Sequence, residues 1–499
     1  MRGRRQFLTG ASTLAGLTLL AQNRAVLALD TTTDYQLIIV GAGTAGIPAA
    51  TFAAARGARV LMIDAAPDIG GTLHLSTGQM SAAGTRLQAR LGIKDSAQLH
   101  YDDVMRISKN SADPQLVRLA VDHAADTFDW LMDKGFRPLP DHPVLGQGHE
   151  PYSERRYYWA ANGGRDILAV LRAELAPHLA SGRVDLLLGT PVTALLTDDA
   201  GSVEAVRVQA GDRERVLRAR HVLLSCGGYV SNPELFEQLS GVRDYGDNGY
   251  AYSQGAGIKL GVAVGGFIRG RENYLSNFGS ILANDRFPAK VFARFQVIPQ
   301  LRAPWEIFVN VRGERFIRED EPSFDRREVA LLPQPDLRFW VIFDDEIFAN
   351  VPPGVIGFSR DEMRGAFDVH AWFQKGDSLE GLAKRAGIDA AGLREKVEEY
   401  NRAVATGKDR FGRRHLPRPI AKGPFYAIRH QGHSTTSTVG LAVDEQLRVI
   451  RARGEPIRNL HAAGELLGAG QLMGQSFVGG MMVTPAMTFG RLLGQRLPL

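Results

Sequence analysis

The sequence predicts an α/β fold in which one parallel-sheet domain is interrupted by a second, α+β domain. The first observation is a short apolar run, residues 37–40, which leads directly into a G-x-G-x-x-G pattern at Gly41, Gly43 and Gly46. The second is that an Ala-rich helix and another apolar strand follow, and that this strand ends on Asp64. Strand, glycine turn, helix, strand and acid in this order are typical of a Rossmann-like unit.

Each glycine of this pattern has its own physical role. Gly41 permits the tight turn after the strand, and Gly43 lets the backbone approach a pyrophosphate. Gly46 lets the helix pack closely on the strand, and the helix N-terminus then presents free N–H groups to the phosphates. Asp64 is placed to accept a hydrogen bond from a ribose hydroxyl. The pattern therefore predicts a dinucleotide-binding site.

The composition excludes several classes of protein. The chain has 499 residues, 44% of them hydrophobic and 23% charged, as expected for a globular protein of two domains. Its net charge of +5 comes mainly from arginines in residues 1–28, and the nearly neutral remainder argues against nucleic-acid binding. Cys226 is the single cysteine, which excludes an intrachain disulfide and a multi-thiolate metal centre. We expect no metal.

The first residues are typical of an export signal. Arg4 and Arg5 precede an apolar run at 10–21, and Val26 and Ala28 fit the small-residue pattern of a cleavage site. The run is too short to span a bilayer, which disfavours a membrane anchor. We therefore expect a twin-arginine signal peptide over residues 1–28, a periplasmic or otherwise exported protein, and no stable membrane span.

More glycine turns follow Asp64 than a nicotinamide-binding site needs. Gly70-Gly71 and Gly78 come soon after it, and Cys226-Gly227-Gly228 ends a later buried strand. These turns fit a long FAD laid across the domain. A further apolar strand, Leu460 to Ala463, leads to Glu465, which is placed for the ribityl chain. The sequence therefore predicts FAD as the cofactor.

We expect this FAD to be bound non-covalently, since His74 is best interpreted as an ordinary loop histidine. Thr484-Pro485 is expected to cap and start a helix whose positive end points at the flavin N1–O2 edge. The remaining residues expected to bind FAD are Thr44, Ala45, Gly71, Thr72, Gly78, Gln79, Met80, Val192, Cys226, Gly227, Gly228, Gly464, Glu465, Gly480, Met481, Met482 and Val483.

The residue pattern predicts where one domain interrupts the other. Residues 34–271 carry the glycine fingerprint and the strands around it. Residues 272–437 change to mixed strands and short helices, as expected for an inserted α+β cap that contacts substrate. Residues 438–499 return to the first domain.

Together these residues resemble the flavoprotein family of periplasmic fumarate reductases and 3-ketosteroid dehydrogenases. The resemblance covers nearly the whole chain after residue 34, and its landmarks are Gly70-Gly71, Cys226-Gly227-Gly228, Gly313-x-Arg315-Phe316, Ile342-Phe343-Asp344-Asp345, Gly407-Lys408-Asp409, Ala462-Ala463-Gly464-Glu465 and Phe489-Gly490-Arg491. It implies a glutathione-reductase-type FAD domain with a cap. It also implies hydride transfer between the flavin N5 atom and a carbon–carbon bond next to an electron-withdrawing group.

The chain departs from this family at its substrate positions. Phe477 stands where fumarate reductases have a carboxylate-binding Arg, and Ser437 where they have a substrate His. Asn277 replaces their cap His, and no Arg lies four residues past Glu319. The ketosteroid dehydrogenases have tyrosines where this chain has Ser323 and Phe477. We expect an apolar pocket, and the residues expected to line it are Phe477, Thr436, Ser437, Ser323 and Asn277.

The acid–base group stays open at this level. It must lie on the face of the reacting bond opposite the flavin. Arg326 and Tyr158 are the first candidates because cap and aromatic loops in this family face the flavin, and the others are Tyr157, Arg302, Tyr274 and His433. Each of them also has an ordinary structural interpretation, as a salt-bridged arginine, a packed tyrosine or a loop histidine.

Three hypotheses follow. The first is an FAD enzyme that desaturates, or in reverse reduces, a C–C bond beside a carbonyl of an apolar, cyclic, ketone-type substrate. The second is a reductase of an unsaturated organic acid that uses Arg302 and Arg326. The third is a catalytically degraded flavin-binding protein. Because only one dinucleotide fingerprint is present, electrons would be exchanged with a separate quinone or cytochrome partner.

Overall fold

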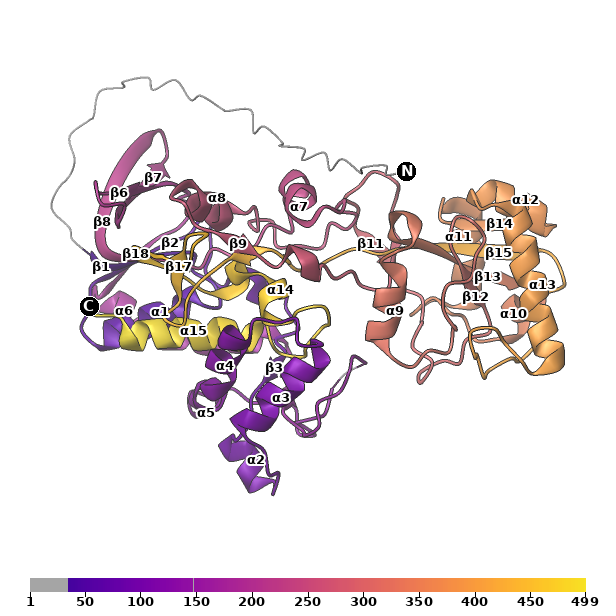
Figure 1. The fold of residues 1–499 in the computed structure, drawn as a ribbon, viewed down its shortest axis with the longest axis horizontal. Helices are drawn as coiled ribbons and strands as arrows, with labels where there is room; N and C mark the ends of the chain where they lie inside the picture. Colours follow the sequence, from indigo (N-terminus) through magenta and orange to yellow (C-terminus); the bar gives the residue numbers. More distant parts are fainter. Residues whose placement is uncertain (1–34, 147) are drawn as a thin grey trace, which may run out of the picture.

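The computed structural model describes residues 35–146 and 148–499, so the predicted export signal at 1–28 lies outside the described residues. Figure 1 shows an elongated molecule, with the first and last parts of the chain together at one end and the segment that carries β12 to β15 and α10 to α13 at the other. Helix α9, Phe324–Leu331, lies between these two parts.

The first part is built on one large sheet with the strand order β17-β18-β8-β1-β2-β5. Strands β18, β8, β1, β2 and β5 are parallel to their neighbours, and β17 pairs with β18 in the antiparallel sense. Residues 37–40 are buried in the centre of the sheet, as the apolar run predicts. The strands are β1 (Tyr35–Val40), β2 (Val60–Ile63), β5 (Val184–Leu187), β8 (Arg213–Leu224), β17 (Arg448–Ile450) and β18 (Pro456–Ala462).

Helices cover this sheet, and a smaller sheet extends from it. Helix α1, Gly46–Ala55, packs against α15, Val483–Arg496, from the opposite end of the chain. Strand β8 continues into an antiparallel sheet with β6, Val192–Thr197, and β7, Val203–Ala210. The other helices of this part are α2 (Arg86–Arg90), α3 (Ala97–Ile107), α4 (Pro114–Asp122), α5 (Ala124–Asp133), α6 (Gly164–Ala180), α7 (Pro233–Ser240), α8 (Ala256–Ala263) and α14 (Ala469–Leu472).

The cap has its own sheet and its own core. Its antiparallel order is β12-β13-β15-β14, with β12 Ile307–Val309, β13 Arg338–Asp344, β14 Phe373–Gly376 and β15 Phe425–Gln431. Aromatic side chains fill the space behind it; the ring of Phe339, for example, stacks on His430 at 4.9 Å. The helices around it are α9 (Phe324–Leu331), α10 (Asp345–Asn350), α11 (Arg360–Val369), α12 (Leu379–Ala386) and α13 (Ala390–Thr406).

Two extended segments join the parts. The backbone N–H of Asn277 donates to the carbonyl of His433 at 3.0 Å, so the outgoing and returning segments lie side by side. Tyr274 packs against both hydrophobic cores. The short pieces are β3 (Met80–Ser81) paired with β4 (Tyr157–Tyr158), β9 (Ile268–Arg269) paired with β16 (Gly440–Leu441), and β10 (Ile281–Leu282) paired with β11 (Val291–Ala293).

Three helices, α3 to α5, follow one another, since α4 ends at Asp122 and α5 begins at Ala124. One local expectation was wrong. The last helix begins at Val483 after Met482, so Thr484 is not its cap; the Thr484 hydroxyl instead accepts from the backbone N–H of Ser81 at 2.9 Å. Among the described residues, no helix is both long and apolar enough to cross a membrane.

Candidate cofactor and active site

The turn between β1 and α1 forms an open cradle. A side chain at Gly43 would meet no atom within 4 Å, and a Cβ at Gly71 would lie 3.6 Å from the Gly43 Cα. The first turn of α1 has no side-chain cap, since Ala45 precedes it, with Thr44 beside it in the turn. Uncapped backbone N–H groups beside empty space are the donors that phosphates bind.

Asp64 ends β2 beside this cradle. Its carboxylate accepts from the backbone N–H of Ala42 at 2.7 Å and of Ala66 at 2.8 Å. Burial raises the pKa of Asp64, and these two hydrogen bonds oppose the rise. The Asp64 carbonyl also accepts from the N–H of Thr190 at 2.9 Å. Val192, which begins β6, follows Thr190 by two residues. The carboxylate is thus fixed at the turn and keeps acceptor capacity for a hydroxyl group.

A second group of cofactor candidates meets at the ends of β8 and β18. The hydroxyl of Ser437 accepts from the Tyr229 N–H at 2.7 Å, and the Ser437 N–H donates to Glu465 at 3.0 Å. A Cβ at Gly228 would lie 1.9 Å from that hydroxyl oxygen, so only glycine fits there. Burial raises the pKa of Glu465 and raises that of the Cys226 thiol to about 12, which leaves the thiol protonated.

A third group lies where β3 meets the loop before α15. A Cβ at Gly480 would lie 2.3 Å from the Ser81 nitrogen, so the two backbones are in close contact. Met481 is buried, and Met482 and Val483 are partly exposed. Thr72 lies in the short helix Gly71–His74, Gly78 and Gln79 precede β3, and Met80 pairs with Tyr158. Nε2 of His74 lies 3.0 Å from the Ile69 carbonyl. The three groups together fit the phosphates, ribityl chain and ring of FAD.

Tyr157 and Tyr158 are packed into the first domain, and Tyr274 packs against both cores. Tyr158 is fully buried; its hydroxyl lies 3.0 Å from that of Thr85, and burial raises its pKa. Tyr157 is also buried, with its ring under Gly479. Tyr274 has a buried hydroxyl, and burial raises its pKa too. These side chains stabilise the fold around the site.

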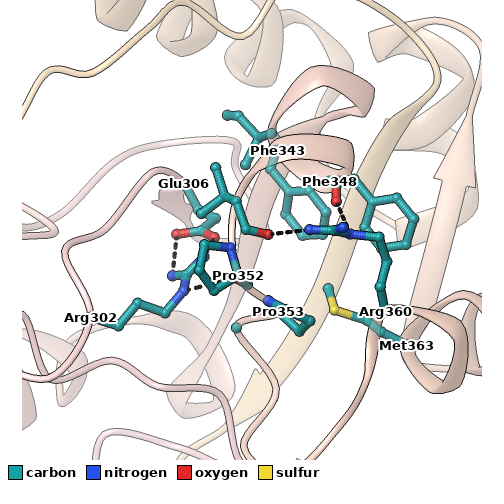
Figure 2. A pocket seen from close by; sticks show the side chains of 11 residues that line it. Arg302, Glu306, Phe343, Phe348, Pro352, Pro353, Arg360 and Met363 are labelled. Carbon is teal, nitrogen blue, oxygen red and sulfur yellow. Dashed lines mark hydrogen bonds and ion pairs between the residues drawn. The ribbon is translucent and has the colours of Figure 1, made fainter.

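The two arginine candidates do not come together. Arg326 lies on α9 with 77% of its side chain exposed and only a 4.0 Å approach to Glu321. Arg302 forms a bidentate ion pair with Glu306 at 2.5 and 3.0 Å inside the cap. Figure 2 shows this pair lining a small pocket with Phe343, Phe348 and Met363. The pair satisfies the Arg302 guanidinium within the cap.

His433 and Asn277 do meet, between the two connecting segments. The Asn277 amide lies 3.1 Å from Nε2 of His433, and the hydroxyl of Ser280 lies 3.2 Å from the same nitrogen. Burial, assisted by the charge of Arg294, lowers the pKa of His433 to about 4. Ser434 turns its hydroxyl to the Thr436 carbonyl nearby. The result is a buried group of neutral hydrogen-bonding side chains.

Four residues that sequence reasoning missed gather at the boundary between the cap and the first domain. We call His149, Asp325, Arg327 and Glu328 the boundary cluster. Nδ1 of His149 lies 3.2 Å from Asp325, and ligand atoms of His149, Asp325 and Glu328 all lie within 4.8 Å of one another. The His149 ring lies 4.4 Å from that of Phe477, and Ser323 caps the helix that carries the other three.

The pKa values of the groups in this cluster are strongly shifted. Burial alone would lower the pKa of His149, but the hydrogen bond to Asp325 and the charges of Glu328 and Asp325 outweigh it and raise that pKa. Burial raises the pKa of Glu328 to about 7 and lowers that of Arg327 to about 10. Perturbed groups of this kind gather at functional sites. No sequence spacing links His149 to α9, so only the fold brings them together.

Comparison with known proteins places the chain in a family. The sequence matches the family described as FAD binding domain over residues 36–478. A fumarate reductase (cytochrome) of Shewanella frigidimarina is 29% identical, over 95% of this chain and 79% of the relative. A 3-oxosteroid 1-dehydrogenase of Mycolicibacterium smegmatis is 25% identical, over 92% and 96%.

A solved structure supports the same assignment of fold. The 3-ketosteroid Δ1-dehydrogenase of Sterolibacterium denitrificans superposes with a TM-score of 0.70 at 22% identity, covering 93% of this chain and 99% of that one. The predicted fold class and FAD cofactor are thereby confirmed. The chain belongs to the FAD binding domain family, with fumarate reductases and 3-ketosteroid dehydrogenases among its relatives, and is an FAD-dependent dehydrogenase or reductase.

Proposed function

We propose that this enzyme acts on a C–C bond next to a carbonyl of an apolar, cyclic, ketone-type substrate, by desaturation or the reverse reduction. The observation that carries the proposal is the neutral polar group around His433. With its pKa near 4, this imidazole is uncharged at neutral pH, and Asn277 and Ser280 beside it are uncharged as well. Neutral donors of this kind suit a ketone oxygen, which needs hydrogen bonds and no counter-charge.

Phe477 supports an apolar substrate. Its side chain is partly exposed, and its ring centre lies 4.4 Å from that of His149. A dicarboxylate would need cationic forks at both ends. Arg302 is already bound by Glu306, and Arg326 points to solvent, so neither offers a buried fork.

The residues of the three cofactor groups would hold FAD without a covalent bond. The cradle at Gly43 and the N-terminus of α1 would bind the pyrophosphate, Asp64 a ribose hydroxyl, and Glu465 the ribityl chain. When bound, FAD supplies two-electron hydride exchange with the substrate carbon. The protein must supply hydrogen bonds to the carbonyl, exclusion of water and a group that takes or gives the remaining proton.

We further propose export through the twin-arginine pathway and a separate electron partner. Arg4 and Arg5 with the following apolar run support export of the folded, FAD-loaded chain. The single glycine fingerprint leaves no second dinucleotide domain in the sequence for a nicotinamide. A quinone or a cytochrome would therefore exchange electrons with the flavin, in line with the cytochrome in the name of the Shewanella relative.

A reductase of an unsaturated organic acid is the second candidate. Arg327 favours it, because this buried guanidinium has no carboxylate within ion-pair distance among the described residues. A substrate carboxylate could supply that partner. The reductase and dehydrogenase relatives have similar identity to this chain, so similarity alone does not choose between the two candidates.

Anaerobic flavin absorbance tests the proposal. The purified enzyme is mixed with saturated cyclic ketones and, separately, with saturated organic acids. The proposal predicts bleaching of the oxidised flavin by at least one ketone and by none of the acids. Bleaching by an acid, or reoxidation of the chemically reduced flavin only by unsaturated acids, would establish the second candidate. A flavin that reacts with neither class would identify a degraded site.

A further inference from the structure

The boundary cluster joins a loop of the first part of the chain to helix α9. His149 comes from a loop of the first domain, and Asp325, Arg327 and Glu328 come from α9 of the cap. The approach is close because Gly148, at φ +86°, has no side chain; a Cβ there would lie 2.6 Å from the ring of Phe324. Asp325 also accepts from the backbone N–H of Glu150 at 2.8 Å. The imidazole is therefore held in a fixed place against the cap.

The cluster is not fully satisfied by its own contacts. One terminal nitrogen of Arg327 is buried and has no partner among residues 35–146 and 148–499. Glu328 is only 7% exposed and makes no hydrogen bond or ion pair within the described part of the chain. Buried polar groups normally find partners, so these two imply a group that arrives from outside.

A resident metal ion fits the cluster poorly. His149 and the two carboxylates lie close enough to share an ion. However, Arg327 acts on the same groups as a fixed positive charge, and the His149–Asp325 hydrogen bond occupies the Nδ1 atom. A cation would have to displace that bond and lie beside a guanidinium. A proton fits better, because a histidine and two carboxylates can each hold one.

The geometry leaves one imidazole nitrogen for the substrate. Nδ1 of His149 is engaged by Asp325, and Nε2 has no partner within the described residues. The ring contacts that of Phe477 at 4.4 Å between centres, two residues before Gly479, where the loop enters the third cofactor group. An imidazole oriented through one nitrogen by a carboxylate is a standard arrangement for proton transfer through the other.

We propose that His149 is the residue that exchanges the substrate proton, with Asp325 as its positioning residue and Glu328 as the next proton carrier. This inference rests on the proposed function. In desaturation, one hydrogen leaves the β-carbon with both electrons of its bond and goes to the oxidant, FAD. The α-hydrogen leaves as a proton to Nε2 of His149, and the electron pair of that C–H bond forms the new C=C bond. In reduction, both transfers run in reverse.

Hydrogen exchange separates this proton step from the redox step. The FAD of the enzyme is first reduced with dithionite, so that it can no longer accept hydride. A saturated cyclic ketone that bleached the oxidised enzyme is then incubated with it in D2O, and loss of the α-hydrogen NMR signal is followed. We expect wild-type exchange above the buffer rate and a loss of at least about 100-fold in His149→Gln.

His142→Gln is the matched control, since His142 lies in the same loop and its Nδ1 also approaches an aspartate, Asp141, at 3.0 Å. It should exchange like the wild type. Equal exchange in His149→Gln and the wild type would overturn the inference while the flavin bleaching, and hence the proposed function, still stands. If the wild type neither bleaches with any ketone nor exchanges with any, both fail together.

Asp325→Asn tests the positioning role without removing the imidazole. Only the unprotonated Nε2 can take a proton. The rate of α-hydrogen exchange must therefore rise as increasing pH deprotonates His149. The charges that act on this ring are Asp325 and Glu328, which favour its protonated form, and Arg327, which opposes it. Removing the charge of Asp325 should shift the rise to lower pH, and a histidine NMR titration should show the same shift. An unchanged profile would exclude Asp325 from this role.

Discussion

A buried group of charged side chains within the cap differs in one respect from the boundary cluster. In this cap group, Arg315 binds both oxygens of Glu319, at 2.8 and 2.6 Å, and also Asp409 at 2.6 Å. Arg413 binds the same Glu319 at 2.9 Å and three backbone carbonyls. Each guanidinium is matched by carboxylates or carbonyls, so this group is complete without a ligand.

The boundary cluster, in contrast, is incomplete. Arg327 has one unpaired nitrogen, and Glu328 has no partner in the described chain. The difference teaches how to separate buried charge that stabilises the fold from buried charge kept for chemistry. The first kind is fully paired, and the second has unused hydrogen-bonding capacity.

The largest effect is expected from Arg315→Met. It leaves Glu319 and Asp409 buried without their main partner, which costs about 3–5 kcal/mol of the free energy of unfolding. Urea unfolding of the FAD-loaded protein measures this loss. Arg364→Gln is the control, because its ion pair with Asp361 is exposed and should contribute less than about 1 kcal/mol. Equal losses of unfolding free energy in the two variants would show that the fully paired buried group stabilises the fold no more than an exposed ion pair.

Glu328→Gln should raise the free energy of unfolding, by a smaller amount that depends on pH. The folded pKa of about 7 lies above the ordinary value of 4.5, so the unfolded chain loses this proton first, and wild-type stability falls as pH rises from about 4.5 to 7. The amide cannot ionise, and the variant should be more stable than the wild type by about 2 kcal/mol at pH 8.

The control for that prediction is the same comparison at pH 4, where Glu328 is protonated in both states and the two proteins should unfold at similar urea concentrations. A variant that is less stable than the wild type at pH 8 would show that the Glu328 carboxylate has a stabilising partner after all.

Arg327→Met should change stability least. Burial already lowers the pKa of Arg327, so its charge is costly, and an apolar chain of similar length removes that cost along with two hydrogen bonds to backbone carbonyls. We expect a change within about 1 kcal/mol by urea unfolding. A loss of stability as large as that of Arg315→Met would show that both arginines stabilise the fold.

Local patterns predicted the cofactor half of the molecule well. Residues 37–64 form a strand, turn, helix and strand that follow each other in sequence, and each piece has its own periodicity or turn residue. Strand β1 begins two residues before the expected apolar run, and β2 ends at Ile63, directly before Asp64.

The chemistry of the substrate side could not be predicted in the same way. His149 and Asp325 are 176 residues apart, and neither lies in a recognisable motif. Neighbouring residues can also face opposite ways: Arg326 is exposed while Arg327 is fully buried, because they lie on different faces of α9. Which arginine of such a pair faces the interior depends on how the helix packs, and this becomes visible only in the folded chain.

The central claim is that the site selects a carbonyl over a carboxylate, and one pair of compounds tests it directly. Chemically reduced enzyme is mixed anaerobically with cyclohex-2-enone or with cyclohex-1-enecarboxylate, and flavin reoxidation is followed by stopped-flow absorbance. Both are six-membered rings with a conjugated double bond, next to a ring carbonyl in the first compound and to a carboxylate substituent in the second. We predict reoxidation at least about tenfold faster with the enone, because the groups around His433 are neutral. Faster reoxidation by the carboxylate would contradict the account and assign the enzyme to unsaturated acids.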